Sequence, residues 1–307
     1  MRIVKLTKET TENILENMLR RSPTQYGQQE AVVAEIIADV RARKDQAIFD
    51  YTEKFDKAKI SVENIRVTEA EIQDAYTLVD PSLLEVVKKA LINIRDYHEK
   101  QKQNSWFNST PQGTILGQKV TPMEKVGVYV PGGKAVYPSS VLMNVVPAKV
   151  AGVGKIIMTT PCNAEGKVNP AVLVAAKEAG VDEIYKVGGA QAIAALAYGT
   201  ESIPKVDKIV GPGNIFVALA KKAVYGNVSI DSIAGPSEIL VLADETANPR
   251  YVAADLLSQA EHDELASAIL ITTSREFAAK VSEEVDGFVK ILSRKEIIQK
   301  SLDNFGY

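Results

Sequence analysis

The fold is decided by a stretch that begins Val126-Gly127-Val128-Tyr129-Val130-Pro131-Gly132-Gly133. A short apolar run is followed by a glycine-rich turn and then, from Ser139 to Ala151, by a segment with the apolar pattern of a helix. The same unit recurs three more times, with strands predicted at 155–160, 183–187 and 208–210 and helices at 170–179, 190–198 and 214–225. Four strand–helix units in about a hundred residues, with glycine after the helices, predict a parallel, doubly wound α/β sheet.

The segment before this block is predicted to be mostly helical. Apolar residues at steps of three and four predict one long amphipathic helix from about Gln28 to Phe55. Thr68 and Glu71 have the spacing of a capping box, and Asp80-Pro81 is a typical helix start, so two more helices follow. Short strands are then expected between Gly113 and Thr121.

The segment after the block returns to alternating strands and helices. We expect strands at 239–243 and 268–273, a helix from about Pro249 to His262, and helical structure after Phe277. The predicted fold class is therefore α/β, with two Rossmann-like doubly wound domains, the second inserted into the first, and an N-terminal helical extension. The expected boundaries are 1–25 for the extension, 26–126 with 237–307 for the first domain, incomplete at its C-terminus, and 127–236 for the inserted domain.

Composition narrows the class of protein. A chain of 307 residues is long enough for two domains, and 46% hydrophobic with 24% charged residues is ordinary for a globular protein. The net charge of −3 argues against nucleic-acid binding, which needs clustered positive charge. The single cysteine, Cys162, excludes an internal disulfide framework and fits a reducing compartment. Because no secretory signal and no apolar run of membrane-spanning length is visible, we expect a soluble, cytoplasmic protein with no membrane partner.

Three glycine-rich turns are the first candidates for a ligand site. They are Val130-Pro131-Gly132-Gly133, Gly188-Gly189-Ala190-Gln191 and Gly211-Pro212-Gly213-Asn214. Each follows a predicted strand and leads into a helix, whose first N–H groups can bind a phosphate. A single turn of this kind is more often only a tight connection, but three at one sheet edge favour a nucleotide. The complete G-x-G-x-x-G fingerprint is missing, so we expect weak binding.

The chain has only two histidines, and they differ in context. His98 lies in a polar stretch of a predicted helix and is best read as a solvated side chain. His262 follows Gln259 by three residues, so the two share a helix face, and carboxylates Glu261 and Asp263 flank it. A metal site and a histidine that binds the last carbonyls of its helix both remain open on this spacing alone. Cys162 is read as a loop thiol without a catalytic role.

Five longer motifs resemble histidinol dehydrogenases. They follow that family's order and spacing, and the similarity runs from about residue 25 to the end of the chain. The motifs are 128–133, 187–199, 210–214, 233–238 and 257–263. The resemblance implies the four-electron oxidation of L-histidinol to L-histidine through histidinal, with two NAD⁺ reduced in turn, which is the last step of histidine biosynthesis.

The resemblance also implies roles for particular residues. Tyr129, Gln191 and Asn214 match NAD contacts of the family, so 127–236 is the expected NAD-binding domain. Ser237 matches a substrate contact. Gln259 and His262 match zinc ligands that also touch the substrate, with one zinc per subunit in a complete enzyme. A homodimer with a shared active site is implied as well.

One departure from the family pattern bears on activity. In the family a downstream Glu-His pair is the general acid/base, and an Asp and a second His complete the zinc site; we expect all of these to lie beyond Tyr307. Two neutral ligands do not make a closed four-coordinate zinc site, so the 1–307 chain is expected to be inactive alone. The alternatives are a related zinc- and NAD-dependent dehydrogenase of another small alcohol, and a non-catalytic NAD-binding or dimerisation fragment.

Overall fold

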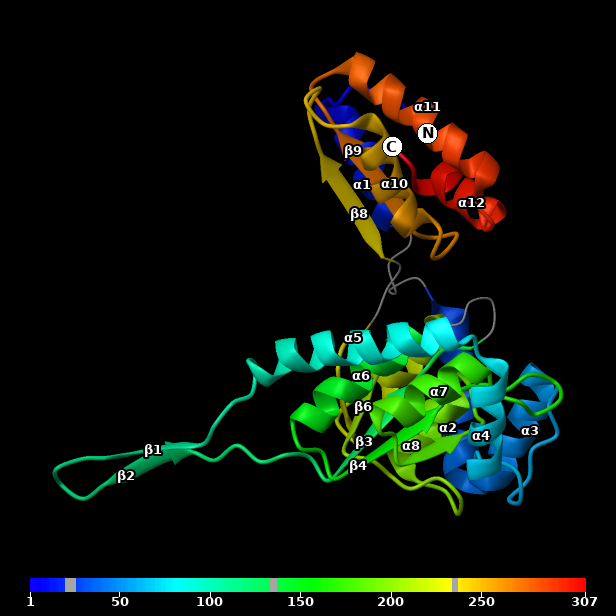
Figure 1. Ribbon diagram of the computed structural model, residues 1–307, viewed down its shortest axis with the longest axis vertical. Helices are drawn as coiled ribbons and strands as arrows, with labels where there is room; N and C mark the ends of the chain where they lie inside the picture. The colour runs from blue at the N-terminus through cyan, green and yellow to red at the C-terminus, as the bar shows by residue number, and fades with distance from the viewer. Residues whose placement is uncertain (20–25, 133–136, 234–236) are drawn as a thin grey trace. The chain divides into compact units, whose positions relative to one another are not determined.

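The computed structural model describes residues 1–19, 26–132, 137–233 and 237–307 (Figure 1). Gly133 of the first turn, residues 20–25 of the expected extension and the Ala234–Pro236 part of one motif lie outside the described residues. The chain divides into two compact units, residues 28–234 and residues 1–27 with 235–307. Each unit is described by itself.

The larger unit is built on a five-stranded parallel sheet, as the repeated strand–helix pattern predicts. The strands are β3 (Lys125–Tyr129), β4 (Lys155–Thr159), β5 (Glu183–Tyr185), β6 (Lys208–Val210) and β7 (Ser229–Ile230). Their order in the sheet is β5-β4-β3-β6-β7, so the chain reverses direction across the sheet between β3 and β6. This is the order of doubly wound folds, in which ligands bind at the reversal, at the carboxyl ends of the strands. The α/β class with a parallel sheet is thus confirmed; β7 is a strand that the sequence pattern did not reveal.

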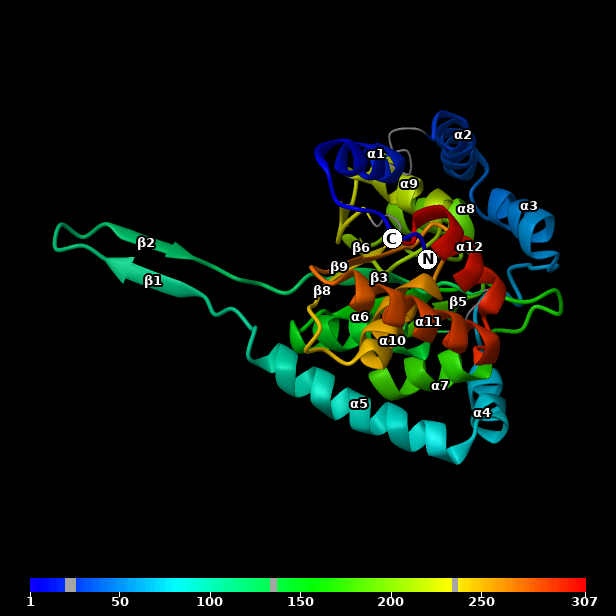
Figure 2. The same ribbon diagram turned by 90° about the horizontal axis from the view of Figure 1, so that it is seen from above.

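Helices cover both faces of this sheet (Figure 2). The connecting helices are α6 (Pro138–Val150), α7 (Pro170–Ala179), α8 (Gly189–Tyr198) and α9 (Ile215–Val224). Helices α6 and α7 pack together on one face with α4 (Glu69–Leu78) and α5 (Pro81–Glu99) outside them, whereas α8 packs with α9 and with α3 (Asp45–Asp56). The strands are therefore buried from both sides, which explains why they read as continuous apolar runs.

Local signals in the sequence fix most of the helix starts. Thr68 and Glu71 form the predicted capping box of α4, and Asp80 caps α5 with Pro81 in its first turn. Asn169 caps α7 in the same way. These side chains accept the N–H groups that the first helical turn leaves without partners, so each helix begins at its cap.

The single helix expected from Gln28 to Phe55 is wrong. The structure has two helices there, α2 (Gly27–Arg43) and α3, separated at Lys44. Lys44 adopts a positive φ of 49°, which an α-helix does not allow, and the break lets Asp45 bond Ser202 of the loop after α8. The apolar spacing continues across the break, and for this reason the pattern alone did not show it.

The segment between α5 and β3 forms a hairpin that extends away from the sheet in both views (Figures 1 and 2). Its strands are β1 (Trp106–Ser109) and β2 (Ile115–Gln118), paired antiparallel with every residue exposed. The expected strands in this region are thus present, and the first begins earlier than Gly113.

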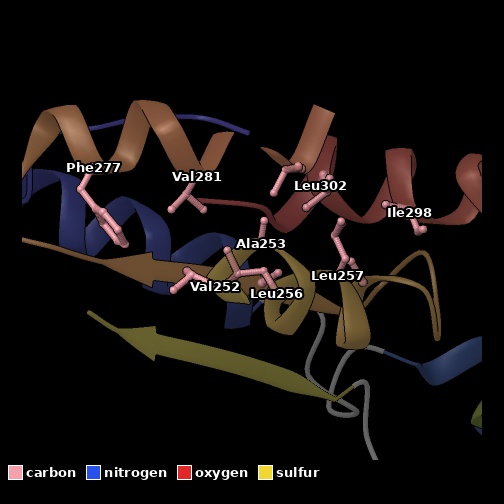
Figure 3. Close-up of a cluster of buried hydrophobic side chains, with 11 residues drawn as sticks. Val252, Ala253, Leu256, Leu257, Phe277, Val281, Ile298 and Leu302 are labelled. Atoms are coloured by element: carbon pink, nitrogen blue, oxygen red, sulfur yellow. The ribbon is translucent and has the colours of Figure 1, made fainter. Parts of the chain in front are cut away.

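The smaller unit has a parallel pair of strands covered by helices. Strands β8 (Glu238–Leu242) and β9 (Ser267–Ile271) are joined through α10 (Pro249–Ala260) and followed by α11 (Arg275–Ile291) and α12 (Lys295–Phe305). The apolar faces of these three helices form the core, with Leu256 of α10, Val281 of α11 and Ile298 of α12 fully buried (Figure 3). The N-terminal segment and α1 (Lys8–Leu19) belong to the same unit, where the Arg2 guanidinium donates to the Asn304 carbonyl at 2.6 Å.

The compact units differ from the grouping expected from the sequence. Residues 28–126 pack with the five-stranded sheet because α4 and α5 bury their apolar faces, including Ile72 and Val87, against α6 and α7. The expectation had grouped 26–126 with 237–307. The insertion of one domain into another stays a prediction.

Candidate functional site

Tyr129 is the centre of the edge at which the strands of the larger unit end. It is the last residue of β3, and its side chain is buried. Its hydroxyl accepts the backbone N–H of Gly189, the first residue of α8, at 3.1 Å. Burial raises the pKa of the phenol to about 12, although the Gly189 bond lowers it and Asp56 raises it further. The hydroxyl is therefore neutral at physiological pH and links β3 to the start of a helix two strands away in the sheet.

The turn after β6 packs directly on the backbone of Tyr129. A Cβ at Gly211 would lie 2.1 Å from the Tyr129 carbonyl oxygen, and the φ of Gly211 is 113°. Both facts require glycine at this position. This close contact joins β3 and β6, the two strands between which the strand order reverses. The turns that follow these strands therefore pack against each other.

The turns after β3, β4 and β5 are packed against one another through Pro161. A Cβ at Gly132 would lie 2.8 Å from Pro161 Cγ, and one at Gly188 would lie 2.6 Å from its Cβ. The glycines thus allow close packing of loops in this region. Only part of the first turn is described, because Gly133 is outside the described residues.

Gln191 lies in the first turn of α8 and is 1% exposed. Its side-chain Oε1 is buried and has no hydrogen-bond partner in the part of the chain that the structure describes. The cap residue of α8 is Gly188, which offers no side-chain acceptor. An unpartnered buried amide oxygen beside a helix start without a side-chain cap fits a ligand that brings both a donor and a negative group.

Asn214 has a different environment from Tyr129 and Gln191. It is exposed, and it is the N-cap of α9, where its Oδ1 accepts the Val217 N–H at 3.2 Å. This cap uses the side-chain oxygen of Asn214, and the amide NH₂ group is the donor of the same side chain. All three expected NAD contacts belong to the βα connections at one edge of the sheet, which is the arrangement that the sequence predicted for them.

A buried lysine supports the turn that carries Asn214. Lys221 of α9 is 2% exposed; its Nζ donates to the Gly211 carbonyl at 2.9 Å and pairs with the Asp231 carboxylate. Asp231 in turn accepts the Gly211 N–H at 2.8 Å. This network fixes both polar groups of Gly211. It was not identified from the sequence, where the only signal was one lysine on the apolar side of a helix.

Cys162 lies in the turn after β4 and is buried. Burial raises the pKa of its thiol to about 11, Asp56 raises it further, and Lys186 lowers it slightly. A thiol with a raised pKa is a poor nucleophile, because the reactive species is the thiolate. Cys162 lies in a loop, as the sequence predicted, and its lack of a catalytic role stays a prediction.

The expected substrate and metal residues lie in the smaller unit. Ser237 precedes β8 and its carbonyl accepts the N–H of Ser267, the first residue of β9, at 3.2 Å. Helix α10 returns from the end of β8 to the start of β9, so Gln259 and His262 lie near the same amino-terminal edge of the strands. His262 is just past the end of α10, exposed, with its N–H donating to the Gln259 carbonyl at 3.1 Å.

Gln259 and His262 do not by themselves fit a zinc ion. Among residues 1–19, 26–132, 137–233 and 237–307, no group of three or more His, Cys, Asp or Glu side chains is close enough to hold a metal. Gln259 and His262 are both neutral, so they do not balance the charge of a zinc ion, and they fill only two of its four coordination positions.

His98, the other histidine, is on α5 with its Nδ1 at 2.7 Å from Gln101 Oε1. The two residues are three positions apart, so the contact is local to the end of α5. The described part of the chain also contains no helix with the length and apolar character needed to cross a membrane.

The strand order and the glycine turns define the class of protein. It is a doubly wound α/β protein whose closely packed turns lie at the carboxyl ends of the strands, where the strand order reverses. The sequence model of histidinol dehydrogenase matches residues 19–307. The chain thus belongs to the histidinol dehydrogenase family, which confirms the resemblance carried by the five motifs.

Individual relatives agree. The chain is similar to histidinol dehydrogenase of Geobacillus kaustophilus, 58% identical over 91% of this chain and 65% of the relative, and to that of Clostridium acetobutylicum, 61% identical over 88% and 62%. Its structure is similar to a histidinol dehydrogenase crystal structure from Elizabethkingia anophelis, with a TM-score of 0.85, 39% identity and coverage of 100% of this chain and 66% of that one. The chain thus spans about two thirds of the length of these relatives.

Proposed function

We propose that this chain is the nucleotide-binding and substrate-contacting part of an L-histidinol dehydrogenase. The reaction is the oxidation of L-histidinol to L-histidine through histidinal, with two NAD⁺ reduced per substrate. The observation that carries the proposal is the junction at the sheet reversal, where Tyr129 bonds Gly189 and Gly211 packs on the Tyr129 backbone, in a chain of this family.

The residues of the larger unit bind and orient the dinucleotide. The N–H groups at the start of α8 take the negative pyrophosphate, since that helix start has no side-chain cap. Gln191 supplies an amide acceptor and Asn214 an amide donor, while the neutral Tyr129 hydroxyl holds the α8 start in place. When bound, NAD⁺ supplies the hydride acceptor; the protein contributes position, which is worth about 7–11 kcal/mol of barrier in well-oriented reactions.

The residues of the smaller unit contact the substrate. Ser237, Gln259 and His262 share one edge of the β8–β9 pair, and all three carry groups that bond the polar atoms of an amino alcohol. A zinc ion, one per subunit, belongs to the proposed complete enzyme, and Gln259 with His262 is its contribution from this chain. We also propose a cytoplasmic homodimer with a shared active site.

Calorimetry with NAD⁺ tests the nucleotide site in the 1–307 chain. Binding is expected to be weak but measurable, and Gln191→Ala should weaken it about tenfold because a buried polar contact is lost. Gln46→Ala is a matched control on α3, where the side chain donates to Asp50 at 2.9 Å. Equal NAD⁺ affinity in Gln191→Ala and the original chain would remove Gln191 from the site.

Turnover is tested in a protein of the relatives' length that contains this sequence. With L-histidinol it should form two NADH per substrate consumed, and His262→Ala should abolish the reaction whereas His98→Ala should not. Turnover of another small alcohol in place of histidinol would favour a related dehydrogenase. NAD⁺ binding without any turnover would favour a non-catalytic member of the family.

A further inference from the structure

Helix α3 ends with a carboxyl group beside the reversal of the sheet. Asp56 is the last residue of α3, and the chain turns away at Lys57, which is left-handed with a φ of 60°. The charge of Asp56 contributes to the raised pKa of two groups, the Tyr129 phenol and the Cys162 thiol. The segment that follows Asp56 packs on the loop between β4 and α7, where a Cβ at Gly166 would lie 3.7 Å from Ile60 Cδ1. Tyr129 ends β3 and Cys162 follows β4, so the charge of Asp56 reaches the carboxyl ends of these neighbouring strands.

A carboxylate is unfavourable in this place. Burial raises the pKa of Asp56 to about 6, and a helix C-terminus carries partial negative charge. Its Oδ2 is buried with no hydrogen-bond partner among the described residues. The cation that acts on nearby Cys162, Lys186, is already paired with Glu71 at 2.5 Å. The ionised form of Asp56 is therefore disfavoured in the folded chain.

The same edge contains further buried side-chain oxygens without a hydrogen-bond partner among the described residues. Thr159 Oγ1, at the end of β4, and Gln191 Oε1 are also buried and without a partner in the described part of the chain. Oxygen acceptors that lack donors call for a ligand group rich in O–H or N–H. A phosphate is the wrong ligand for Asp56, because two negative groups at close range repel.

Topology indicates which part of a dinucleotide meets Asp56. In doubly wound dinucleotide folds an acidic residue after the second strand bonds the hydroxyls of the adenosine ribose. The second strand of this sheet is β4, and the turn directly after it is Thr160-Pro161-Cys162-Asn163; the acidic residue of this connection, Glu165, comes later and is exposed. Asp56 supplies a carboxylate from a different element, α3, and its charge acts on Cys162.

We propose that Asp56 accepts the hydroxyls of the adenosine ribose and thereby selects NAD⁺ over NADP⁺. The inference rests on the proposed NAD⁺ site and adds a specificity-determining residue to it. A ribose diol offers two donors to the two carboxylate oxygens, and a 2′-phosphate both removes one donor and adds negative charge.

The test is calorimetry of NAD⁺, NADP⁺ and NAD⁺ that lacks the adenosine 2′-hydroxyl, with the 1–307 chain and with Asp56→Asn and Asp56→Ala. Asp50→Asn is the control, since Asp50 lies on the same helix and its carboxylate is paired with Arg43. The original chain should bind NAD⁺ at least about tenfold more tightly than either analogue, as expected for a hydrogen bond to a charged group. Asp56→Asn and Asp56→Ala should lose about tenfold in NAD⁺ affinity and most of the discrimination, whereas Asp50→Asn should behave like the original chain.

The outcomes distinguish a failure of the Asp56 inference from a failure of the proposed NAD⁺ site. If the original chain binds NAD⁺ and both Asp56 variants keep its affinity and its ratio to the 2′-deoxy analogue, Asp56 does not contact the ribose and the inference is overturned. If Asp56 has only a structural role, its variants should lose the same factor of affinity for NAD⁺ and for the 2′-deoxy analogue. That result would also overturn the inference. If the original chain binds none of the dinucleotides, the proposed NAD⁺ site fails first. Melting curves confirm that each variant is folded.

Discussion

The hydroxyl of Tyr129 accepts the N–H of Gly189 at 3.1 Å, across 60 positions of sequence. Tyr129 ends the strand at the sheet reversal, and Gly189 begins a helix whose cap residue has no side chain. The bond satisfies one N–H of that helix start and fixes its position relative to β3. It therefore connects the fold to the proposed nucleotide site.

Removing this hydroxyl should weaken nucleotide binding. Tyr129→Phe is expected to lower NAD⁺ affinity by about fivefold, because a net hydrogen bond is worth about 1 kcal/mol. Tyr76→Phe is the matched control, since its hydroxyl donates to Glu178 at 2.7 Å on α7, away from the βα turns. Calorimetry decides it: an equal loss of affinity in both variants would mean that the Tyr129 effect is only one of stability.

Gly211 should tolerate no side chain. Gly211→Ala places a Cβ 2.1 Å from the Tyr129 carbonyl oxygen, whereas Gly226→Ala, at a φ of 99°, meets nothing within 4 Å. Both variants incur backbone strain of about 1 kcal/mol, but only the first adds overpacking, for a total of about 3 kcal/mol. Urea unfolding measures the difference. Equal free energies of unfolding for the two variants would show that the β6–α9 turn relaxes freely.

The ion pair of buried Lys221 with Asp231 should contribute more to stability than the exposed pair of Lys222 with Glu30. Lys221→Ala removes the cation that pairs with Asp231 and leaves the Gly211 carbonyl without this donor; because solvent reaches Asp231, we expect a loss of about 1–2 kcal/mol in the free energy of unfolding. Lys222→Ala, which removes an exposed pair with Glu30, should cost less than about 0.5 kcal/mol. Similar values for the two lysines would contradict the role given to the Lys221 network.

Asp56 should make the stability of the larger unit depend on pH. The pKa of Asp56 is about 6 in the folded chain against an ordinary value of 3.8. Between these values the folded state binds more protons than the unfolded state, so stability falls as pH rises from about 4 to above 6. Asp56→Asn removes this loss. At pH 7.5 it should raise the melting temperature by about 2–4 °C, equivalent to roughly 1 kcal/mol after allowance for solvent screening.

The comparison with low pH provides the check. At pH 4 the Asp56 carboxyl is mostly protonated in the folded chain, so Asp56→Asn and the original chain should melt together. Asp50→Asn should show no such gain at pH 7.5, because Arg43 lowers the pKa of Asp50 and its charge is favourable in the folded state. A melting temperature of Asp56→Asn below that of the original chain at pH 7.5 would contradict the assigned direction.

Sequence signals predicted the elements whose causes are local. The capping box of Thr68 and Glu71, and the caps at Asp80 and Asn169, each act within three residues, and the structure has all of them. The parallel sheet followed from a repeated unit. The break at Lys44 was missed because its cause is distant: Asp45 bonds Ser202 in another part of the chain.

Residues of the candidate site could be predicted from the sequence only where they belong to a family motif or follow a predicted strand. Tyr129, Gln191 and Asn214 were grouped correctly at one edge because carboxyl ends of parallel strands meet there. Lys221 and Asp56 were not found, since neither belongs to a motif and each acquires its role from burial. A lone lysine in an apolar helix and an aspartate at a helix end are weak signals until a structure shows what they contact.

The last prediction concerns zinc in the smaller unit. Gln259 and His262 offer two neutral donors, and no described cluster of three metal-binding side chains accompanies them. Structural zinc sites gain their affinity from four ligands, commonly including charged thiolates or carboxylates, so two neutral donors should bind far more weakly. After dialysis the 1–307 chain should retain well under one zinc per chain, and His262→Ala should change the zinc content little. His98→Ala is the control for adventitious binding by an exposed histidine. Metal analysis that finds one firmly held zinc per chain, lost in His262→Ala and kept in His98→Ala, would show that other residues of this chain complete the site.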